Sequence, residues 1–313
     1  MINYSQVRDL DHAFAEALPA ETMVAMSSIR SRYIQRRSAF ISGAQMCDLL
    51  LDLGARNEDL DEIQCVSDRL PPDPTLPFRQ SKNGRFFYDV EHNQIYRGEF
   101  QPFVLSADDD FVRHDSDQAR MFAEIGDDLQ SNSVLHALFR FNAYMAEGVD
   151  IARRPKLDYT SNRWVCTLFN LRTITTPELV GEPALEGVHC DGVDHTMTTL
   201  IGCDNMSDDS AITFIHDMRE TNATRSNHAD PDFVVADYQH RHFLDTVLIA
   251  DHERKHSLSP VAAADPSRRA TRDMLIFFTR KPAAPGHVSF PYDSFRQHPS
   301  LPLCVELAPD ERS

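Results

Sequence analysis

A histidine and an aspartate lie two positions apart in the segment 186–192, which reads Glu-Gly-Val-His-Cys-Asp-Gly. Side chains alternate between the two faces of a strand, so an extended segment would place His189 and Asp191 on one face. A mononuclear non-haem iron(II) site takes two histidines and one carboxylate on one side of the metal, and it leaves the opposite positions open for substrate chemistry. The segment therefore predicts two metal ligands, and a second histidine is expected from a later strand.

His256 is the predicted third ligand. The apolar run 245–251 precedes it and a proline turn follows, so it is expected near a strand end that faces the first histidine. His195 is an alternative, because it lies four positions beyond Asp191. On an unbroken strand it would share the face of Asp191, where it would bind the metal or contact its ligands.

Two arginines are candidates for binding a carboxylate. Arg272 stands at the start of the apolar run 271–278, where its guanidinium could hold a carboxylate through two parallel hydrogen bonds. An arginine at a strand start is also often a surface ion pair. Arg172 lies inside an otherwise apolar strand and is a candidate for binding the carboxylate of the substrate, with a structural salt bridge as an equal alternative.

The order of these features resembles a known family. Glu-Gly-x-His-x-Asp-Gly is followed by Asp-Thr-x-Leu-x-x-Asp before a distal histidine, and then by Arg-Asp at the start of a final apolar strand. This ordered set is similar to the 2-oxoglutarate/iron(II) dioxygenases related to isoleucine 4-hydroxylase, and the likeness covers roughly residues 160–280.

The resemblance implies an enzyme that binds Fe(II) through the three predicted ligands and uses 2-oxoglutarate and O2 as co-substrates. It implies oxidation of an unactivated C–H bond in a small substrate, first of all a free aliphatic L-amino acid, by hydroxylation, desaturation or ring closure. In the family an arginine corresponding to Arg272 binds the distal carboxylate of 2-oxoglutarate. Arg272 lies sixteen positions after His256, and shorter intervals are common in the wider superfamily, so Arg268 and Arg269 are alternatives.

A second function class matches part of the same stretch. The pentapeptide His252-Glu253-Arg254-Lys255-His256 has the His-Glu-x-x-His spacing of zinc metallopeptidases, which place both histidines on one face of a helix. The apolar strand before it and the proline after it leave little room for a helix. A third alternative is a non-enzymatic jelly-roll binding module whose histidines are incidental.

The elements that must position these residues are mainly strands. Beyond residue 160, β-branched and aromatic runs alternate with polar turns and predict strands over 164–176, 196–203, 211–218, 233–238, 243–250 and 274–279. Many short strands without helices between them favour a double-stranded β-helix, the cupin-like jelly roll. The expected organisation is one domain over 1–313, with a helix-rich N-terminal support region, 1–150, and a catalytic core, 160–280.

Local patterns in the N-terminal region predict three further features. Apolar spacing and a capping box indicate a helix over 43–53, and helical periodicity from about 117 to 147 predicts a long helix or a pair of helices. The dipeptide Asn83-Gly84 indicates a hairpin turn.

Composition excludes several classes of partner. The net charge of −17 repels phosphate backbones, which argues against nucleic acid, and no apolar run is long enough to cross a bilayer. The first six residues lack the apolar core of a signal peptide, so a cytoplasmic location is expected. The sequence gives no indication of oligomeric state.

Overall fold

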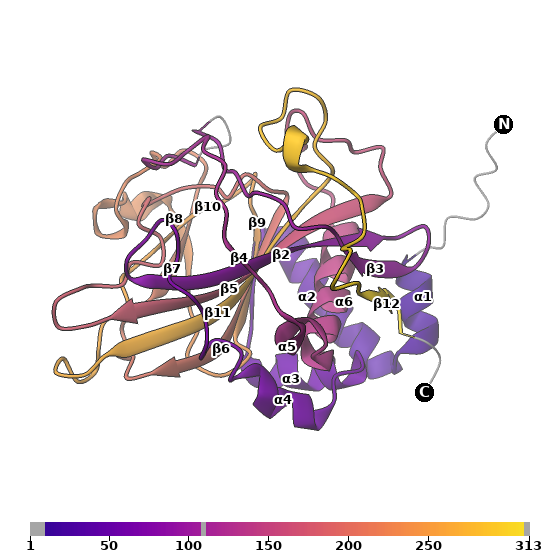
Figure 1. The fold of residues 1–313 in the computed structure, drawn as a ribbon, viewed down its shortest axis with the longest axis horizontal. Coiled ribbons are helices and arrows are strands. Elements are labelled where there is room, and N and C mark those ends of the chain that lie inside the picture. The colour runs from indigo at the N-terminus through magenta and orange to yellow at the C-terminus, as the bar shows by residue number, and fades with distance from the viewer. Residues whose placement is uncertain (1–9, 108–110, 310–313) are drawn as a thin grey trace.

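The structure is a computed structural model that describes residues 10–107 and 111–309 (Figure 1). The first six residues, on which the predicted location depends, lie outside these ranges. The α-helices are α1 (Leu10–Ala17), α2 (Ala20–Arg36), α3 (Gly43–Asp52), α4 (Asn57–Ile63), α5 (Asp127–Gln130) and α6 (Ser133–Glu147). Within the described ranges no helix is long and apolar enough to cross a membrane.

Two sheets form the core of the fold. The large sheet has the order β1-β9-β6-β11-β5-β2-β3-β12, and β4 pairs with β2. Its strands are β1 (Ser38–Ile41), β2 (Arg79–Asp89), β3 (Gln94–Arg97), β4 (Ala123–Glu124), β5 (Arg163–Thr175), β6 (His195–Asp204), β9 (Thr246–Ala250), β11 (Ala270–Arg280) and β12 (Cys304–Glu306). The small sheet has the order β10-β7-β8 and contains β7 (Ile212–His216), β8 (Val234–Gln239) and β10 (Lys255–Leu258).

The chain has the predicted double-stranded β-helix fold, a cupin-like jelly roll. All neighbours in both sheets run antiparallel except β2 and β4. The helix-rich region supplies β1 and β2, which pair with β9 and β5 from the second half of the chain. The two regions therefore share one sheet.

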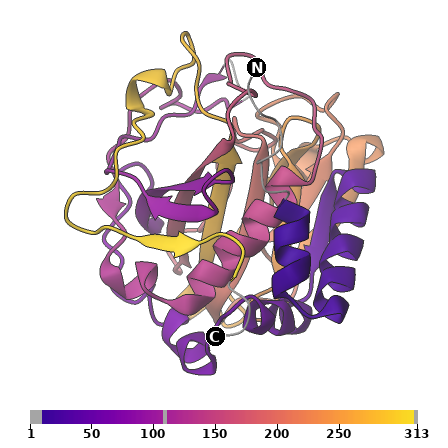
Figure 2. The same cartoon turned by 90° about the vertical axis from the view of Figure 1, so that its right-hand side faces the viewer.

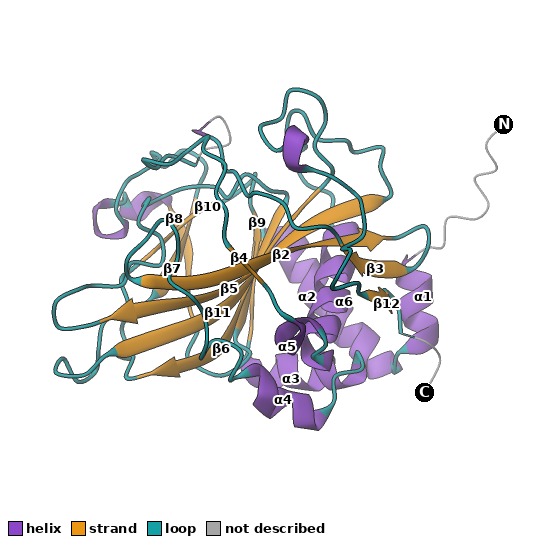
Figure 3. Ribbon diagram, in the orientation of Figure 1, coloured by secondary structure: helices purple, strands orange, loops and turns teal. Residues whose placement is uncertain are grey.

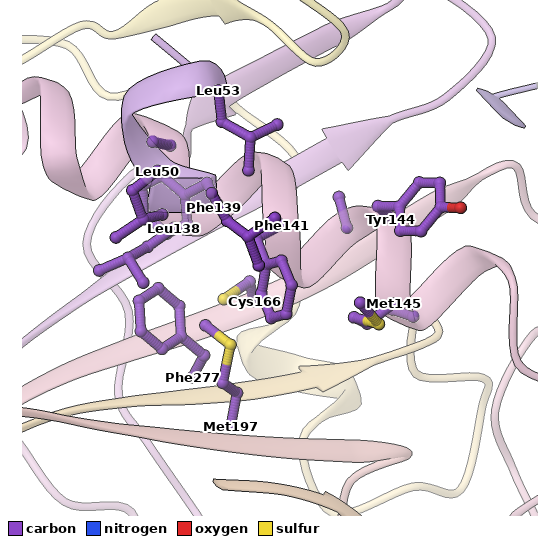
Figure 4. Packing of buried hydrophobic residues seen from close by; sticks show 14 of the residues in the cluster. Leu50, Leu53, Leu138, Phe139, Phe141, Tyr144, Met145, Cys166, Met197 and Phe277 are labelled. Atoms are coloured by element: carbon purple, nitrogen blue, oxygen red, sulfur yellow. The ribbon is translucent and has the colours of Figure 1, made fainter. Parts of the chain in front are cut away.

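The helices cover one face of the large sheet (Figures 1 and 3). A view from the helical side shows α6 crossing in front of the strands (Figure 2). Phe139 and Phe141 of α6 pack with Met197 and Phe277 of the sheet in the main apolar core (Figure 4). This packing fixes which face of each strand is left for a site.

Alternation along β11 separates the core from the opposite face. Leu275 and Phe277 belong to the helix-covered core, whereas Met274, Ile276 and Phe278 line a pocket on the other side of the sheet. Because side chains alternate with period two, Arg272 shares the face that lines the pocket.

The predicted strands and the helix over 43–53 are confirmed. Ser42 caps α3 by accepting a hydrogen bond from the backbone N–H of Gln45 at 3.4 Å. β11 begins four residues earlier than predicted, at Ala270, so Arg272 lies inside the strand rather than at its start.

The predicted hairpin at Asn83-Gly84 is wrong, because both residues lie in the middle of β2. A Cβ atom on Gly84 would lie 3.2 Å from the ring of Phe86 and 3.6 Å from Ile125. The glycine therefore permits close packing beside the strand. The Asn-Gly turn signal is local in sequence, so it carries no information about the distant strands that pair with β2.

The long helix, or helix pair, predicted from about 117 to 147 is confirmed from residue 127 onward, as α5 and α6, but not over the residues before it. α6 begins at Ser133, where the side chain of Asn132 accepts a hydrogen bond from the backbone N–H of Val134 at 2.9 Å. The preceding residues contain β4 and a backbone pairing between Phe103 and Arg120. Long-range pairing thus overrides the helical periodicity of this segment.

Candidate metal centre and its pocket

The two predicted histidine ligands are joined by their backbones. The N–H of His189 donates to the carbonyl of His256 at 3.0 Å, and the N–H of His256 donates to the carbonyl of His189 at 2.9 Å. His256 lies in β10, whereas His189 lies outside the named strands and makes only this one bridge. The glycines on either side of it, Gly187 and Gly192, have φ of 77° and 71°. The left-handed glycines explain why 186–192 is a turn with one bridge and not a regular strand.

The structure brings His189, Asp191 and His256 together. All three are buried, and one nitrogen or oxygen atom from each lies within 4.8 Å of the others. Nε2 of His189 is 3.4 Å from Oδ1 of Asp191, and Nε2 of His256 is 3.5 Å from Oδ2 of Asp191. The two imidazole centroids are 4.2 Å apart.

Neighbouring groups orient this cluster. Nδ1 of His189 donates to the carbonyl of Gly187 at 2.8 Å, which leaves Nε2 as the ring atom available to a metal. The hydroxyl of Thr196 donates to Oδ2 of Asp191 at 2.7 Å. The backbone N–H of Asp191 donates to the Asp251 carboxylate at 2.8 and 2.9 Å.

Asp251 is itself held by Arg154, whose Nη2 donates to it at 2.7 Å. Thr196, Asp251 and Arg154 were not among the site residues predicted from sequence. Asp251 is the last residue of the Asp-Thr-x-Leu-x-x-Asp pattern, which was the available signal.

Burial and charge shift the pKa values of the cluster in different directions. Burial opposes the charged form of His189, but the carboxylates of Glu186 and Asp191 outweigh it and raise the pKa of His189 to about 9. Burial and the nearby His189 lower the pKa of His256 to about 3. The two histidines outweigh burial and hold the pKa of Asp191 near 2, so the carboxylate is an anionic donor at neutral pH.

Arg272 lies in the same pocket. Its side chain is buried, Nη2 is 3.3 Å from Nδ1 of His240, and Nε has no hydrogen-bond partner within the described residues. Burial lowers its pKa to about 10, which still leaves a cation at neutral pH. The alternatives Arg268 and Arg269 are exposed and do not line the pocket.

Arg172 has the geometry of a structural salt bridge. Its Nε and Nη2 donate to the two carboxylate oxygens of Asp273 at 2.7 Å each, and Nη2 also donates to Asp68 at 3.0 Å. It is not among the residues that line the pocket. The fork formed by Nε and Nη2 of its guanidinium is therefore already used inside the protein.

His195 points away from the metal cluster. Its Nδ1 lies 2.9 Å from the hydroxyl of Tyr33, and its ring packs near Trp164. The expectation that it would face the ligands assumed an unbroken strand, but the left-handed Gly192 interrupts the chain before β6. The alternation of β6 then places Thr196 toward the pocket and His195 toward the helices.

The His-Glu-x-x-His motif does not form a helix. His252 and Glu253 lie in a turn, and His256 lies in β10. Glu253 pairs with Arg37 at 2.8 Å and accepts the backbone N–H of Ala152 at 2.8 Å. The helical arrangement that a zinc peptidase needs is therefore missing at this motif.

The metal cluster lies on the wall of an open pocket of about 810 Å³, a volume that includes solvent space at its mouth. Much of the rest of the wall is apolar and aromatic, with Phe103, Leu105, Phe111, Phe122, Phe169, Met274, Ile276 and Phe278. Two imidazoles and one carboxylate are a donor set that suits Fe(II), which would bind His189 in place of the proton on Nε2. The buried guanidinium of Arg272 has no carboxylate partner among the described residues, so it suits a carboxylate ligand in the same pocket.

A jelly roll with two histidines and one carboxylate at its open pocket defines a mononuclear non-haem iron oxygenase class. The model of the 2OG-Fe dioxygenase family matches residues 64–278 of this chain. The chain belongs to this family, whose enzymes use Fe(II), 2-oxoglutarate and O2. The predicted enzyme class and cofactors are thus confirmed at the level of the family.

Individual relatives agree with this assignment. The chain is 46% identical over 285 residues to the bifunctional enzyme flvA of Aspergillus flavus, covering 91% of this chain but only 35% of that protein. It spans about a third of the length of that curated relative. The structure of the Fe(II)/α-ketoglutarate-dependent dioxygenase TqaL is 47% identical, with a TM-score of 0.79, over 93% of this chain and 99% of that chain.

A more distant structure shares the fold alone. IDO from Bacillus thuringiensis is 15% identical, with a TM-score of 0.63, and the match covers 82% of this chain and 99% of that chain.

Proposed function

We propose that this protein is an Fe(II)- and 2-oxoglutarate-dependent dioxygenase that oxidises an unactivated C–H bond of a free L-amino acid. One observation carries the proposal: the cluster of His189, Asp191 and His256 lines the same aromatic pocket as buried Arg272, which has no carboxylate partner in the described ranges. A relation to isoleucine 4-hydroxylase, suggested by the order of the sequence motifs, is part of the proposal.

His189, Asp191 and His256 would hold Fe(II), and Arg272 would bind the distal carboxylate of 2-oxoglutarate. When bound, iron(II) with 2-oxoglutarate and O2 supplies an oxidant strong enough for C–H bonds, coupled to conversion of 2-oxoglutarate to succinate and CO2. The guanidinium of Arg272 replaces water at the carboxylate it binds, and burial strengthens this charge-assisted contact.

The chain's other residues orient the ligands and exclude water. Thr196 fixes the Asp191 carboxylate through its 2.7 Å hydrogen bond, and Gly187 fixes the His189 ring. Phe103, Phe169 and the other pocket rings shield the reaction from solvent, which prevents side reactions of an oxidant. The same apolar wall favours a substrate with an apolar side chain.

The test is succinate release from 2-oxoglutarate under air with Fe(II) and ascorbate, measured across a panel of L-amino acids. We expect one or more aliphatic amino acids to raise succinate above the substrate-free level. The product masses then distinguish hydroxylation, which adds one oxygen atom, from desaturation or ring closure, which removes two hydrogens. If no amino acid raises succinate while 2-oxoglutarate still binds, the substrate class is wrong.

We also propose that the chain forms one domain over 1–313, with a support region over 1–150 and a catalytic core over 160–280, because the two regions share the large sheet. Limited proteolysis tests this: one domain predicts no stable fragment that begins near residue 150. A cytoplasmic location stays a prediction.

A further inference from the structure

The pocket wall contains four arginines that differ in their partners. Arg79 and Arg113 each donate to a buried aspartate, at 2.8 Å for Arg79 and at 2.5 and 2.7 Å for Arg113. Arg120 and Arg272 have no hydrogen-bonded carboxylate among the residues that the structure describes. The proposed function uses Arg272 to bind 2-oxoglutarate. Arg120 is then a second cation in the pocket, and the bound co-substrate does not supply a carboxylate for it.

Arg120 is buried, with 7% of its surface exposed, and its Nε and Nη2 have no hydrogen-bond partner in the described part of the chain. A carboxylate oxygen of Asp115 lies 3.5 Å from Nη1, too far for a good hydrogen bond. Burial and the neighbouring Arg113 lower the pKa of Arg120 to about 10, so it remains a cation at neutral pH. A buried guanidinium with unused donors is costly unless a ligand satisfies it.

The guanidinium of Arg120 is held in place by aromatic rings. Its central carbon lies 5.3, 5.7 and 5.9 Å from the ring centroids of Phe103, Phe111 and Phe122, all of which line the pocket. Its backbone exchanges two hydrogen bonds with that of Phe103, at 2.9 and 2.8 Å. The cation is therefore buried against aromatic rings in the pocket wall, and burial strengthens charge-assisted recognition.

Glu186 provides the opposite charge in the same pocket. Its side chain is 9% exposed, with Oε1 3.2 Å from Nε2 of His189 and Oε2 3.8 Å from Nη1 of Arg113. Because Nδ1 of His189 donates to a carbonyl, Nε2 carries the lone pair when the ring binds a metal, and it cannot then donate to Glu186. The Glu186 carboxylate is thus left as an acceptor on the pocket wall, next to the metal ligands.

We propose that Arg120 binds the α-carboxylate and Glu186 binds the α-ammonium of the amino-acid substrate. This assignment rests on the proposed function. Arg113 and Asp115 link the two residues, since Arg113 contacts both Glu186 and Asp115, and Asp115 contacts Arg120. The substrate would lie between two fixed charges of opposite sign, with its apolar side chain against the phenylalanine rings.

The experiment compares substrates that lack one charge with variants that lack the matching charge. The probes are L-valine, L-leucine and L-isoleucine, the carboxamide of each and the 2-hydroxy acid of each. Their dissociation constants are measured by calorimetry on protein loaded with Mn(II) and 2-oxoglutarate, and succinate release is measured in parallel with Fe(II). The tightest-binding amino acid then serves for all variants.

Wild type is expected to bind the amino acid on the order of 10- to 100-fold more tightly than its carboxamide, because a charge-assisted fork is lost in the amide. In Arg120→Gln this ratio should fall below about 3-fold, and Arg120→Lys should restore part of it. Arg172→Gln is the matched control, because Arg172 is paired outside the pocket, and it should keep the wild-type ratio.

Glu186→Gln should remove the preference for the amino acid over its 2-hydroxy acid and keep the preference over the carboxamide. If Arg120→Gln keeps the full wild-type preference for the amino acid over its carboxamide, the assignment of Arg120 is overturned. The proposed function would still hold in that case, provided that the amino acid still stimulates succinate release. If Arg120→Gln does not fold, Arg120→Lys replaces it, and an unchanged ratio and affinity in that variant would overturn the assignment. No binding and no succinate with any of the amino acids in wild type would overturn both proposals.

Discussion

The carbonyl of Gly187 accepts a hydrogen bond from Nδ1 of His189 at 2.8 Å, and Gly187 itself has φ of 77°. The backbone conformation of a glycine thus determines which ring nitrogen of a proposed metal ligand faces the site. A Cβ atom at position 187 would lie 2.5 Å from the carbonyl oxygen of Thr224 and would force this backbone to move.

Gly187→Ala is therefore expected to weaken Fe(II) binding by on the order of 10- to 100-fold, the usual effect of losing an orienting contact. Gly286→Ala is the control, because Gly286 has φ of 93° and its added Cβ would meet only Lys156, at 3.9 Å. Both variants bear left-handed strain, but only the first contacts the site. Equal Fe(II) affinities in the two variants, measured by anaerobic titration, would argue against an orienting role for Gly187.

Arg272→Gln is expected to raise the dissociation constant for 2-oxoglutarate on the order of 100-fold, because the buried cation and its fork are lost. Arg268→Gln removes the exposed guanidinium that lies 3.5 Å from Asp204, and it should leave this constant unchanged. Calorimetric titration of 2-oxoglutarate into the Mn(II)-loaded proteins provides the measurement. Weakened binding in Arg268→Gln alone would transfer the role to Arg268.

Asp293 joins two buried arginines. It accepts hydrogen bonds from Arg85 at 2.7 Å and from Arg280 at 2.8 and 2.9 Å. Burial opposes its charge, but the arginines outweigh burial and hold its pKa near 2, below the ordinary 3.8. Its contribution to stability is therefore complete above pH 4 and is lost as the pH falls toward 2.

Asp293→Asn should lower the free energy of unfolding by about 3 kcal/mol at pH 7, because two buried cations lose their counter-ion. About 2 kcal/mol of this difference from wild type should disappear between pH 4.5 and pH 2. Urea unfolding at several pH values measures it, with the exposed Asp209→Asn as a control that changes little. A difference that stays constant down to pH 2 would contradict the depressed pKa.

Much of the site could be predicted from sequence, because its residues stand in a fixed order along a few strands. His189, Asp191 and His256 meet as the motif spacing suggested, and Arg272 lies in their pocket. An extended segment at 186–192 was the condition for placing His189 and Asp191 on one face; the segment is a turn instead, and the two histidines meet through one backbone bridge.

The position of Arg120 in the pocket could not be predicted from the order of motifs along the sequence. Arg120 lies in the segment predicted to form a long helix or a helix pair, and its place in the pocket depends on backbone pairing with Phe103, seventeen positions earlier. Asn83-Gly84 shows the same limit of local sequence patterns. This dipeptide is typical of a turn, but it lies inside β2 because β2 pairs with β4 and β5 there. Local periodicity carries no information on such long-range pairing.

The central claim is that the metal cluster of His189, Asp191 and His256, and not the His-Glu-x-x-His motif, supports catalysis. The most direct measurement is Fe(II)-dependent succinate formation by Asp191→Ala and by Glu253→Gln, beside wild type. We expect Asp191→Ala to lose more than about 100-fold of this activity and Glu253→Gln to stay within about 2-fold of wild type. Succinate formation that survives in Asp191→Ala but is lost in Glu253→Gln would contradict the account.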